Sequence, residues 1–223
     1  MPPIVVIDAG HGGERDSGAV YLGREEKNDN LNLALAVGKI DEAECRRLVE
    51  LLQQTPDSIA AILEHKEQAQ YIASSLITAD SLLYIGRGLD YALSMEGSLK
   101  LKEISYIHSE SYAAGELKHG TISLITENMP VIAVATQKAL KEKTISNIKE
   151  VKARGARVIL VCRESDSVDP EAVDIRFDLP EFDDLLMPMI AVVPLQLIAY
   201  YTSVLKGNDV DKPRNLAKSV TVE

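Results

Sequence analysis

Two oppositely charged residues of this chain, Lys100 and Glu103, have the types and the spacing for proton-transfer chemistry. They stand three positions apart in a segment with helical patterning, about 90–104, and residues at that spacing share one face of a helix. A carboxylate can take a proton from one carbon atom and return it to the next. A neighbouring ammonium can neutralise the enolate charge that develops between the two transfers. Most Lys–Glu pairs at this spacing are only solvated surface pairs, so this pair needs further support.

The other residues that commonly carry chemistry give little support when each is taken alone. His65 and His108 have no motif around them, and we expect both to be structural. A single histidine such as His119 is usually structural or exposed. Cys45 and Cys162 form no CxxC pair, which excludes a thiolate zinc site and a disulfide scaffold.

Composition excludes several broad classes of protein. The 223 residues are 46% hydrophobic and 26% charged, which argues against intrinsic disorder. The formal net charge of −10 argues against non-specific nucleic-acid binding, which needs a basic surface. No apolar stretch reaches the roughly 18 uninterrupted residues of a membrane span, and the N-terminus lacks signal-peptide features. We therefore expect a cytoplasmic protein that contacts neither nucleic acid nor membrane.

The segments that must position the chemical residues alternate between strands and helices. Short apolar runs predict buried strands at 81–85, 131–135, 157–162 and 175–179, and a further strand at 105–109. Helical patterns lie between and after them, at 90–104, 138–154 and 187–206. Strands alternating with helices indicate parallel βαβ units with right-handed crossovers. The predicted fold class is therefore α/β: a doubly wound parallel sheet in a three-layer αβα arrangement.

The first 80 residues have a different pattern. A strand at 4–7 is followed by a Gly-rich loop, and loop character persists to Gly23. A helix is predicted from about Asp29 to Pro56, either continuous or broken near Gly38 or Asp41. A second helix is predicted from about Ile59 to Leu76.

From about Glu44 to the C-terminus, the chain resembles the second sugar isomerase (SIS) domain of glucosamine-6-phosphate synthases. The resemblance rests on four motifs: Leu83-Tyr84-Ile85-Gly86-Arg87-Gly88, Glu96-Gly97-Ser98-Leu99-Lys100-Leu101-Lys102-Glu103-Ile104-Ser105-Tyr106, Ala113-Ala114-Gly115-Glu116-Leu117-Lys118-His119-Gly120, and the tail from Asp211 to Glu223. It implies a flavodoxin-like SIS fold over residues 43–223. It also implies the isomerisation step from fructose 6-phosphate to glucosamine 6-phosphate.

The resemblance assigns roles to individual residues. Glu103 matches the base that shuttles the proton, and Lys100 is its neighbour. His119 matches the histidine that assists ring opening in the site of a neighbouring subunit, which implies a homodimer. Lys218 matches the tail lysine that forms an imine with the open-chain ketose and so makes the C1 proton more acidic. Arg214 and Ala217 are the expected substrate contacts, and no cofactor is implied.

The family's phosphate-binding loop, rich in Ser and Thr, belongs to its first SIS domain and has no counterpart here. Ser109-Glu110-Ser111 and Ser165-Asp166-Ser167 are poor replacements, because each carries an anion. We therefore expect impaired sugar-phosphate binding and turnover. The alternative is a scaffold or a sugar-phosphate-binding module without catalysis.

Residues 1–42 resemble the opening of zinc-dependent N-acetylmuramoyl-L-alanine amidases. The resemblance rests on Val6-Ile7-Asp8-Ala9-Gly10-His11-Gly12-Gly13, Asp16-Ser17-Gly18-Ala19 and Glu26-Lys27. It makes His11 and Glu26 two zinc ligands, whereas a hydrolytic site needs a third protein ligand. We therefore expect a βα segment joined to the SIS sheet in a chimeric chain, with an orphaned ligand pair. A zinc amidase is the less favoured alternative.

Overall fold

The computed structural model describes residues 20–21, 24–25, 35 and 38–215. The predicted strand at 4–7, the Gly-rich loop and the start of the helix at Asp29 lie outside these residues. The chain divides into two units, Met1–Asp57 and Ser58–Glu223, which are described separately. In the first unit, β1 (Val20–Tyr21) pairs antiparallel with β2 (Arg24–Glu25). The prediction that a loop continues to Gly23 is therefore wrong.

Helix α2 (Glu42–Glu64) continues through Pro56, where we expected a helix to end. Proline lacks an amide proton for the helical hydrogen bond and usually breaks a helix interior. On the far side of Pro56, Ile62 is buried in the core of the second unit and Ile59 packs against that core. Burial of these side chains offsets the lost hydrogen bond. The chain breaks at His65 instead, and α3 (Lys66–Ser74) follows.

The second unit contains a five-stranded parallel sheet. Its strands are β3 (Ser81–Gly86), β4 (His108–Ala113), β5 (Pro130–Ala135), β6 (Arg157–Arg163) and β7 (Ile175–Leu179). They lie in the order β4-β3-β5-β6-β7, and every neighbouring pair is parallel. With β3 counted as the first strand, this is the 2-1-3-4-5 order of flavodoxin-like folds. The predicted fold class is confirmed.

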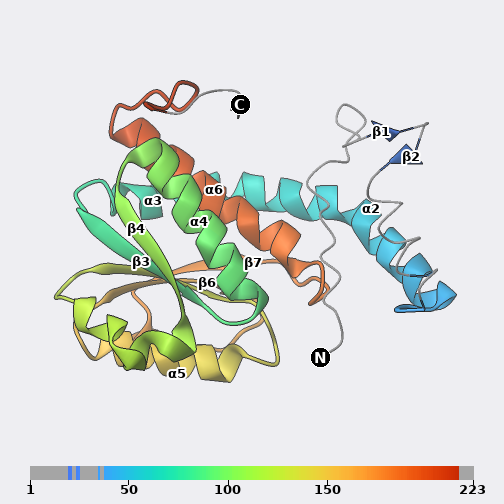
Figure 1. Cartoon of the computed structure of the whole chain (residues 1–223), viewed down its shortest axis with the longest axis horizontal. Helices are drawn as coiled ribbons and strands as arrows, with labels where there is room; N and C mark the ends of the chain where they lie inside the picture. The colour runs from blue at the N-terminus through green and yellow to red at the C-terminus, as the bar shows by residue number, and fades with distance from the viewer. Residues whose placement is uncertain (1–19, 22–23, 26–34, 36–37, 216–223) are drawn as a thin grey trace, which may run out of the picture. The chain divides into compact units, whose positions relative to one another are not determined.

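Helices cover both faces of this sheet, as Figure 1 shows. On one face lie α3, α4 (Leu89–Ser105) and α6 (Met187–Leu205), and α5 (Lys141–Lys152) lies on the other. Alternate residues of β5 serve the two cores: Ile132 and Val134 face the first, Val131 and Ala133 the second. Burial on both faces explains why the strands are nearly continuous apolar runs.

Helix α6 is the one described helix that is long and apolar enough to cross a membrane. Ten of its residues are buried within the domain, among them Ile190, Leu195 and Ile198. Its composition therefore follows from its place in the core between α3 and α4. The predicted helix at 187–206 matches it closely, and Gly207 follows with a φ of 75°.

Two predicted boundaries differ from the structure. The strand expected at 105–109 begins only at His108, because Tyr106 adopts a left-handed backbone conformation that ends α4. Helix α5 begins at Lys141 rather than at Lys138. Both differences lie in connecting turns, where hydrophobic periodicity carries no information.

Gly97 allows α4 to lie close to its neighbours. A Cβ atom at this position would lie 2.9 Å from Tyr84 Cε1 on β3 and 3.0 Å from Leu195 Cδ1 on α6. Those distances are shorter than van der Waals contact, so any side chain here would push α4 away from the sheet. Gly97 thereby fixes the position of the helix that carries Lys100 and Glu103.

Tyr84 gives a test of this packing, because its hydroxyl is fully buried and has no hydrogen-bond partner. Burial also raises the pKa of Tyr84 far above its usual value. Replacing Tyr84 by Phe removes an unsatisfied polar group and should stabilise the domain by about 1 kcal/mol in urea unfolding. Tyr200→Phe on the exposed side of α6 is the control and should change stability by less than about 0.5 kcal/mol. A clear loss of stability in Tyr84→Phe would contradict the assignment.

Candidate functional site

The structure brings Lys100 and Glu103 together near the C-terminal end of α4. Lys100 Nζ donates a hydrogen bond of 2.8 Å to Glu103 Oε2 and lies 3.7 Å from Glu96 Oε1. The two side chains of the pair are 36% and 28% exposed, so they are open to solvent and to a substrate. The hydrogen bond that Lys100 donates to Glu103 raises the pKa of Lys100 and holds it as a cation. Sequence reasoning missed Glu96, although its spacing of four from Lys100 was a usable signal.

The end of this helix is held by residues from the end of α6. Ser203 Oγ donates to the carbonyl oxygen of Ile104 at 2.8 Å, and Asn208 Nδ2 donates to the same oxygen at 3.2 Å. These donors satisfy carbonyl groups that a helix C-terminus leaves unpaired. The last turn of α4, with Glu103 on it, is thereby fixed to the start of the tail.

Arg214 lies against the residue that ends α4. Its backbone amide donates to Tyr106 Oη at 2.9 Å, and its guanidinium carbon lies 4.0 Å from the centre of the Tyr106 ring. The predicted substrate contact is therefore stacked on a tyrosine three residues from Glu103. Ala217 and Lys218 lie outside the described residues, so their predicted roles remain predictions.

His119 and Glu103 lie at opposite ends of the parallel strands: Glu103 is near their amino ends and His119 is near their carboxyl ends. Helix α4 ends where β4 begins, whereas His119 ends the 3-10 helix η1 (Ala114–His119) that follows the last residue of β4. The six residues of β4 span about 17 Å at the usual rise per residue. His119 is also 76% exposed. One chain therefore does not bring His119 and Glu103 into a single site.

The carboxyl edge of the sheet is where open α/β folds usually bind ligands, at the crevice between β3 and β5. Here the residues at this crevice form a hydrogen-bond network among Asp90, Thr136 and Arg163. Asp90, at the start of α4, accepts from the Thr136 amide at 2.8 Å, the Thr136 hydroxyl at 2.6 Å and the Gln137 amide at 3.1 Å. Burial raises the pKa of Asp90, and these donors limit the rise.

Arg163 extends the network away from Asp90. Its guanidinium is 1% exposed and donates at 2.7 Å to the carbonyl oxygens of Thr136 and Phe182, and it also binds Asp184. Asp90, Thr136 and Arg163 at the carboxyl ends of the strands therefore complete hydrogen bonds for one another. The predicted catalytic pair, Lys100 and Glu103, lies near the amino ends of the strands, at the C-terminal end of α4.

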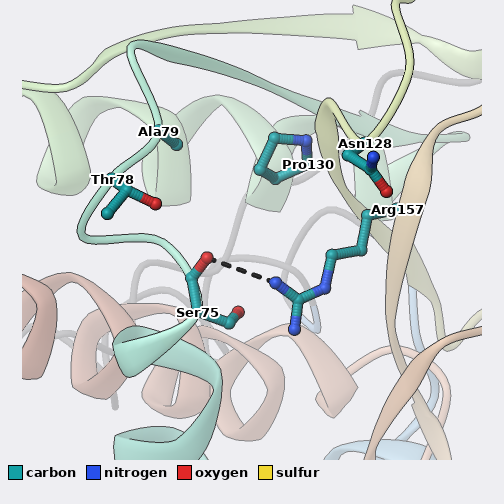
Figure 2. Close-up of a pocket in the computed structure, with 6 residues that line it drawn as sticks. All are labelled: Ser75, Thr78, Ala79, Asn128, Pro130 and Arg157. Carbon is teal, nitrogen blue, oxygen red and sulfur yellow. Dashed lines mark hydrogen bonds between the residues drawn. The ribbon is translucent and has the colours of Figure 1, made fainter.

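One cavity of the described part lies away from the predicted site. It measures about 370 Å³ and lies at the amino ends of β5 and β6, lined by Ser75, Thr78, Ala79, Asn128, Pro130 and Arg157. Figure 2 shows Arg157 reaching across it to the carbonyl oxygen of Ser75, at 3.3 Å. This bond caps the C-terminus of α3, a structural role. Neither Lys100 nor Glu103 lines this cavity.

No group of three or more His, Cys, Asp or Glu side chains within the described residues can hold a metal ion. Cys162 is buried, which raises its pKa to about 12 and leaves it inert as a thiolate ligand. The proposed zinc pair, His11 and Glu26, lies outside the described residues.

The chain is similar to part of curated glutamine–fructose-6-phosphate aminotransferases. The chain is 53% identical over 205 residues to glutamine–fructose-6-phosphate aminotransferase (isomerizing) from Symbiobacterium thermophilum. The match covers 92% of this chain and 32% of the relative. The enzyme of the same name from Caldanaerobacter subterraneus is 52% identical over 193 residues, which is 86% of this chain and 32% of the relative. The chain thus spans about a third of the length of the curated relatives it matches.

Solved structures agree with this match. The C-terminal domain of glucosamine-fructose-6-phosphate aminotransferase from Francisella tularensis superposes with a TM-score of 0.78 at 34% identity. The superposition covers 84% of this chain and 53% of that one. Glucosamine-6-phosphate deaminase from Thermotoga maritima has a TM-score of 0.63 at 23% identity, covering 89% of this chain and 59% of that one, which shows a shared fold alone.

The SIS domain family matches residues 75–206, which contain β3 through α6 and both members of the Lys100–Glu103 pair. This range is more than half of the chain and includes the whole five-stranded sheet. The chain belongs to the SIS domain family, and its SIS domain is of the type found in the C-terminal region of glutamine–fructose-6-phosphate aminotransferases.

Proposed function

We propose that this domain interconverts the ketose and aldose forms of a hexose 6-phosphate, as the isomerisation step of glucosamine 6-phosphate synthesis. The observation that carries the proposal is the Lys100–Glu103 pair, held at 2.8 Å on the fixed end of α4. The family match and the identity to aminotransferases that act on fructose 6-phosphate support the substrate class.

In the proposed reaction, Glu103 takes the proton from C1 of the ketose and returns it to C2. The C–H bond at C1 breaks and an enediol forms as O2 gains a proton. A C–H bond then forms at C2 while O1 gives up its proton, so the carbonyl group moves from C2 to C1. Lys100 neutralises charge on the oxygen at C2 as it develops. In the amination reaction, the Lys218 amine condenses with the C2 carbonyl group to form an imine and releases water. Ammonia supplied from outside this domain then displaces Lys218 from C2 before the proton moves from C1 to C2. Arg214 and Ala217 contact the substrate.

We propose that His119 acts in the site of a second copy of this chain. The position of His119 and Glu103 at opposite ends of the parallel strands supports this, because neither can reach the other within one chain. In a two-fold dimer, each copy would give Glu103 to one site and His119 to the other. The homodimer would then contain two composite sites.

We also propose a cytoplasmic location, with the sugar phosphate as the partner and no nucleic acid or membrane. The net charge of −10 and the names of the curated relatives support this. Calorimetry with fructose 6-phosphate distinguishes an active isomerase from the alternative, a binding module without turnover. Heat of binding without conversion of the sugar would favour the binding module.

The N-terminal segment belongs to a separate part of the proposal. We infer a division near residue 42, with an amidase-like segment before it, from the motifs around His11 and Glu26. The alignment to the Symbiobacterium relative covers 92% of the chain, so it extends into this segment. The amidase-like and SIS-like stretches therefore overlap in sequence within residues 1–42.

Replacing Glu103 by Gln should reduce aldose–ketose exchange by about 10²–10⁴-fold, because the amide cannot accept the proton. The measurement is NMR of the purified chain with fructose 6-phosphate, following the anomeric signals of glucose 6-phosphate. Glu142→Gln, in the first turn of α5, is the matched control and should leave the rate unchanged. Equal rates in the Glu103→Gln and unmodified chains would refute the assignment.

Mixing two inactive variants tests the composite dimer. Glu103→Gln and His119→Ala each damage both sites of their own dimer, but a mixed dimer holds one intact site. An equal mixture after subunit exchange should therefore recover about a quarter of the unmodified activity. Recovery of none, with mixed dimers confirmed by native mass spectrometry, would refute a site shared between two subunits.

Metal analysis after dialysis tests the amidase-like segment. A pair of ligands without a third binds zinc weakly, so less than one zinc per chain is expected. The measurement is inductively coupled plasma mass spectrometry of the full chain, with His11→Ala as the control. A stoichiometric zinc ion lost in His11→Ala would instead establish a zinc site and favour the amidase.

A further inference from the structure

We propose that Tyr106 is a positioning residue that holds the C-terminal tail on the end of α4 by stacking beneath Arg214. The inference rests on the proposed function, because its purpose is to keep Lys218 near Glu103. It is carried by two contacts that join the same two residues. The Tyr106 hydroxyl accepts the Arg214 amide proton at 2.9 Å, and the Arg214 guanidinium lies 4.0 Å from the centre of the ring.

The backbone of Tyr106 points to a role for its side chain. Tyr106 ends α4 in the left-handed region, with φ 62° and ψ 14°. Glycine and asparagine usually fill this position after a helix, because a bulky side chain is strained there. A tyrosine here costs conformational energy, and the phenol contacts with Arg214 provide a compensating gain.

The chain between α6 and Arg214 is shaped to return to this point. Asn208 binds the carbonyl oxygens of Ile104 and Ser105 at the end of α4. Asp209 Oδ1 then accepts from the amides of Asp211 and Lys212, at 3.0 and 3.2 Å, and turns the chain. Arg214 follows two residues later on the Tyr106 ring. The tail is thus joined to α4 at two separated points.

The contact between Arg214 and Tyr106 limits how far the residues after Arg214 can extend from the end of α4. Lys218 is four residues after Arg214, and four extended residues span at most about 14 Å. Glu103 is three residues before Tyr106. Stacking of Arg214 therefore starts the following residues within reach of Glu103, whereas release of Arg214 would leave the tail tied only at Asn208. This raises the effective concentration of the amine at the site.

The test follows tail docking directly, with trypsin cleavage after Arg214 and hydrogen exchange of the tail amides, both by mass spectrometry. Tyr106→Asn suits the left-handed backbone and removes the ring, so it should fold normally and be cleaved about 10-fold faster. Tyr106→Phe keeps the ring and loses the hydroxyl, so it should show faster exchange at the Arg214 amide and a smaller rise in cleavage. Tyr200→Phe is the control and should match the unmodified chain.

The proposal is overturned if cleavage and exchange in Tyr106→Asn equal those of the unmodified chain. It is also overturned if the tail is released while kcat for exchange of fructose 6-phosphate stays unchanged. The expected result is a fall in kcat that matches the loss of docking, with an unchanged pH profile. If the unmodified chain has no activity, the proposed function fails, whereas a tail freed in Tyr106→Asn still establishes the docking contact.

Discussion

The placement of helix α4 is the constraint on which the rest of this domain depends. Its first turn is tied to the loop after β5 by the carboxylate of Asp90, and its last turn is tied to α6 by Ser203 and Asn208. Between these ends, Gly97 brings the helix within contact of β3 and α6. A helix fixed at both ends and along its length presents Lys100 and Glu103 in one geometry, which proton transfer requires.

The same helix separates two edges of the sheet with different properties. At the carboxyl edge, Asp90, Thr136 and Arg163 satisfy one another, so the usual ligand crevice of the fold is occupied by the protein's own side chains. At the amino edge, the charged pair on α4 stays partly exposed. The chemistry proposed for this domain therefore uses the end of a helix rather than the switch point of the sheet.

Sequence reasoning found the sheet because β3, β5, β6 and β7 are buried on both faces and read as continuous apolar runs. It misplaced β4, an edge strand of polar residues, and ended a helix at Pro56 although tertiary packing carries α2 past it. The Lys100–Glu103 pair was predictable from its spacing. The Tyr106–Arg214 contact was not, because it joins residues 108 positions apart through a conformation that no local pattern encodes.

The hydrogen-bond network among Asp90, Thr136 and Arg163 also limits which substitutions the domain tolerates. Asp90, Thr136 and Arg163 are each buried, and each completes hydrogen bonds for another. A single replacement leaves buried partners unsatisfied, and even a joint replacement by apolar side chains leaves the Thr136 and Gln137 amides and the Thr136 and Phe182 carbonyl oxygens without these partners. The hydrogen bonds of these three side chains therefore constrain all three positions together, whereas an exposed side chain such as that of Tyr71 is under no such constraint.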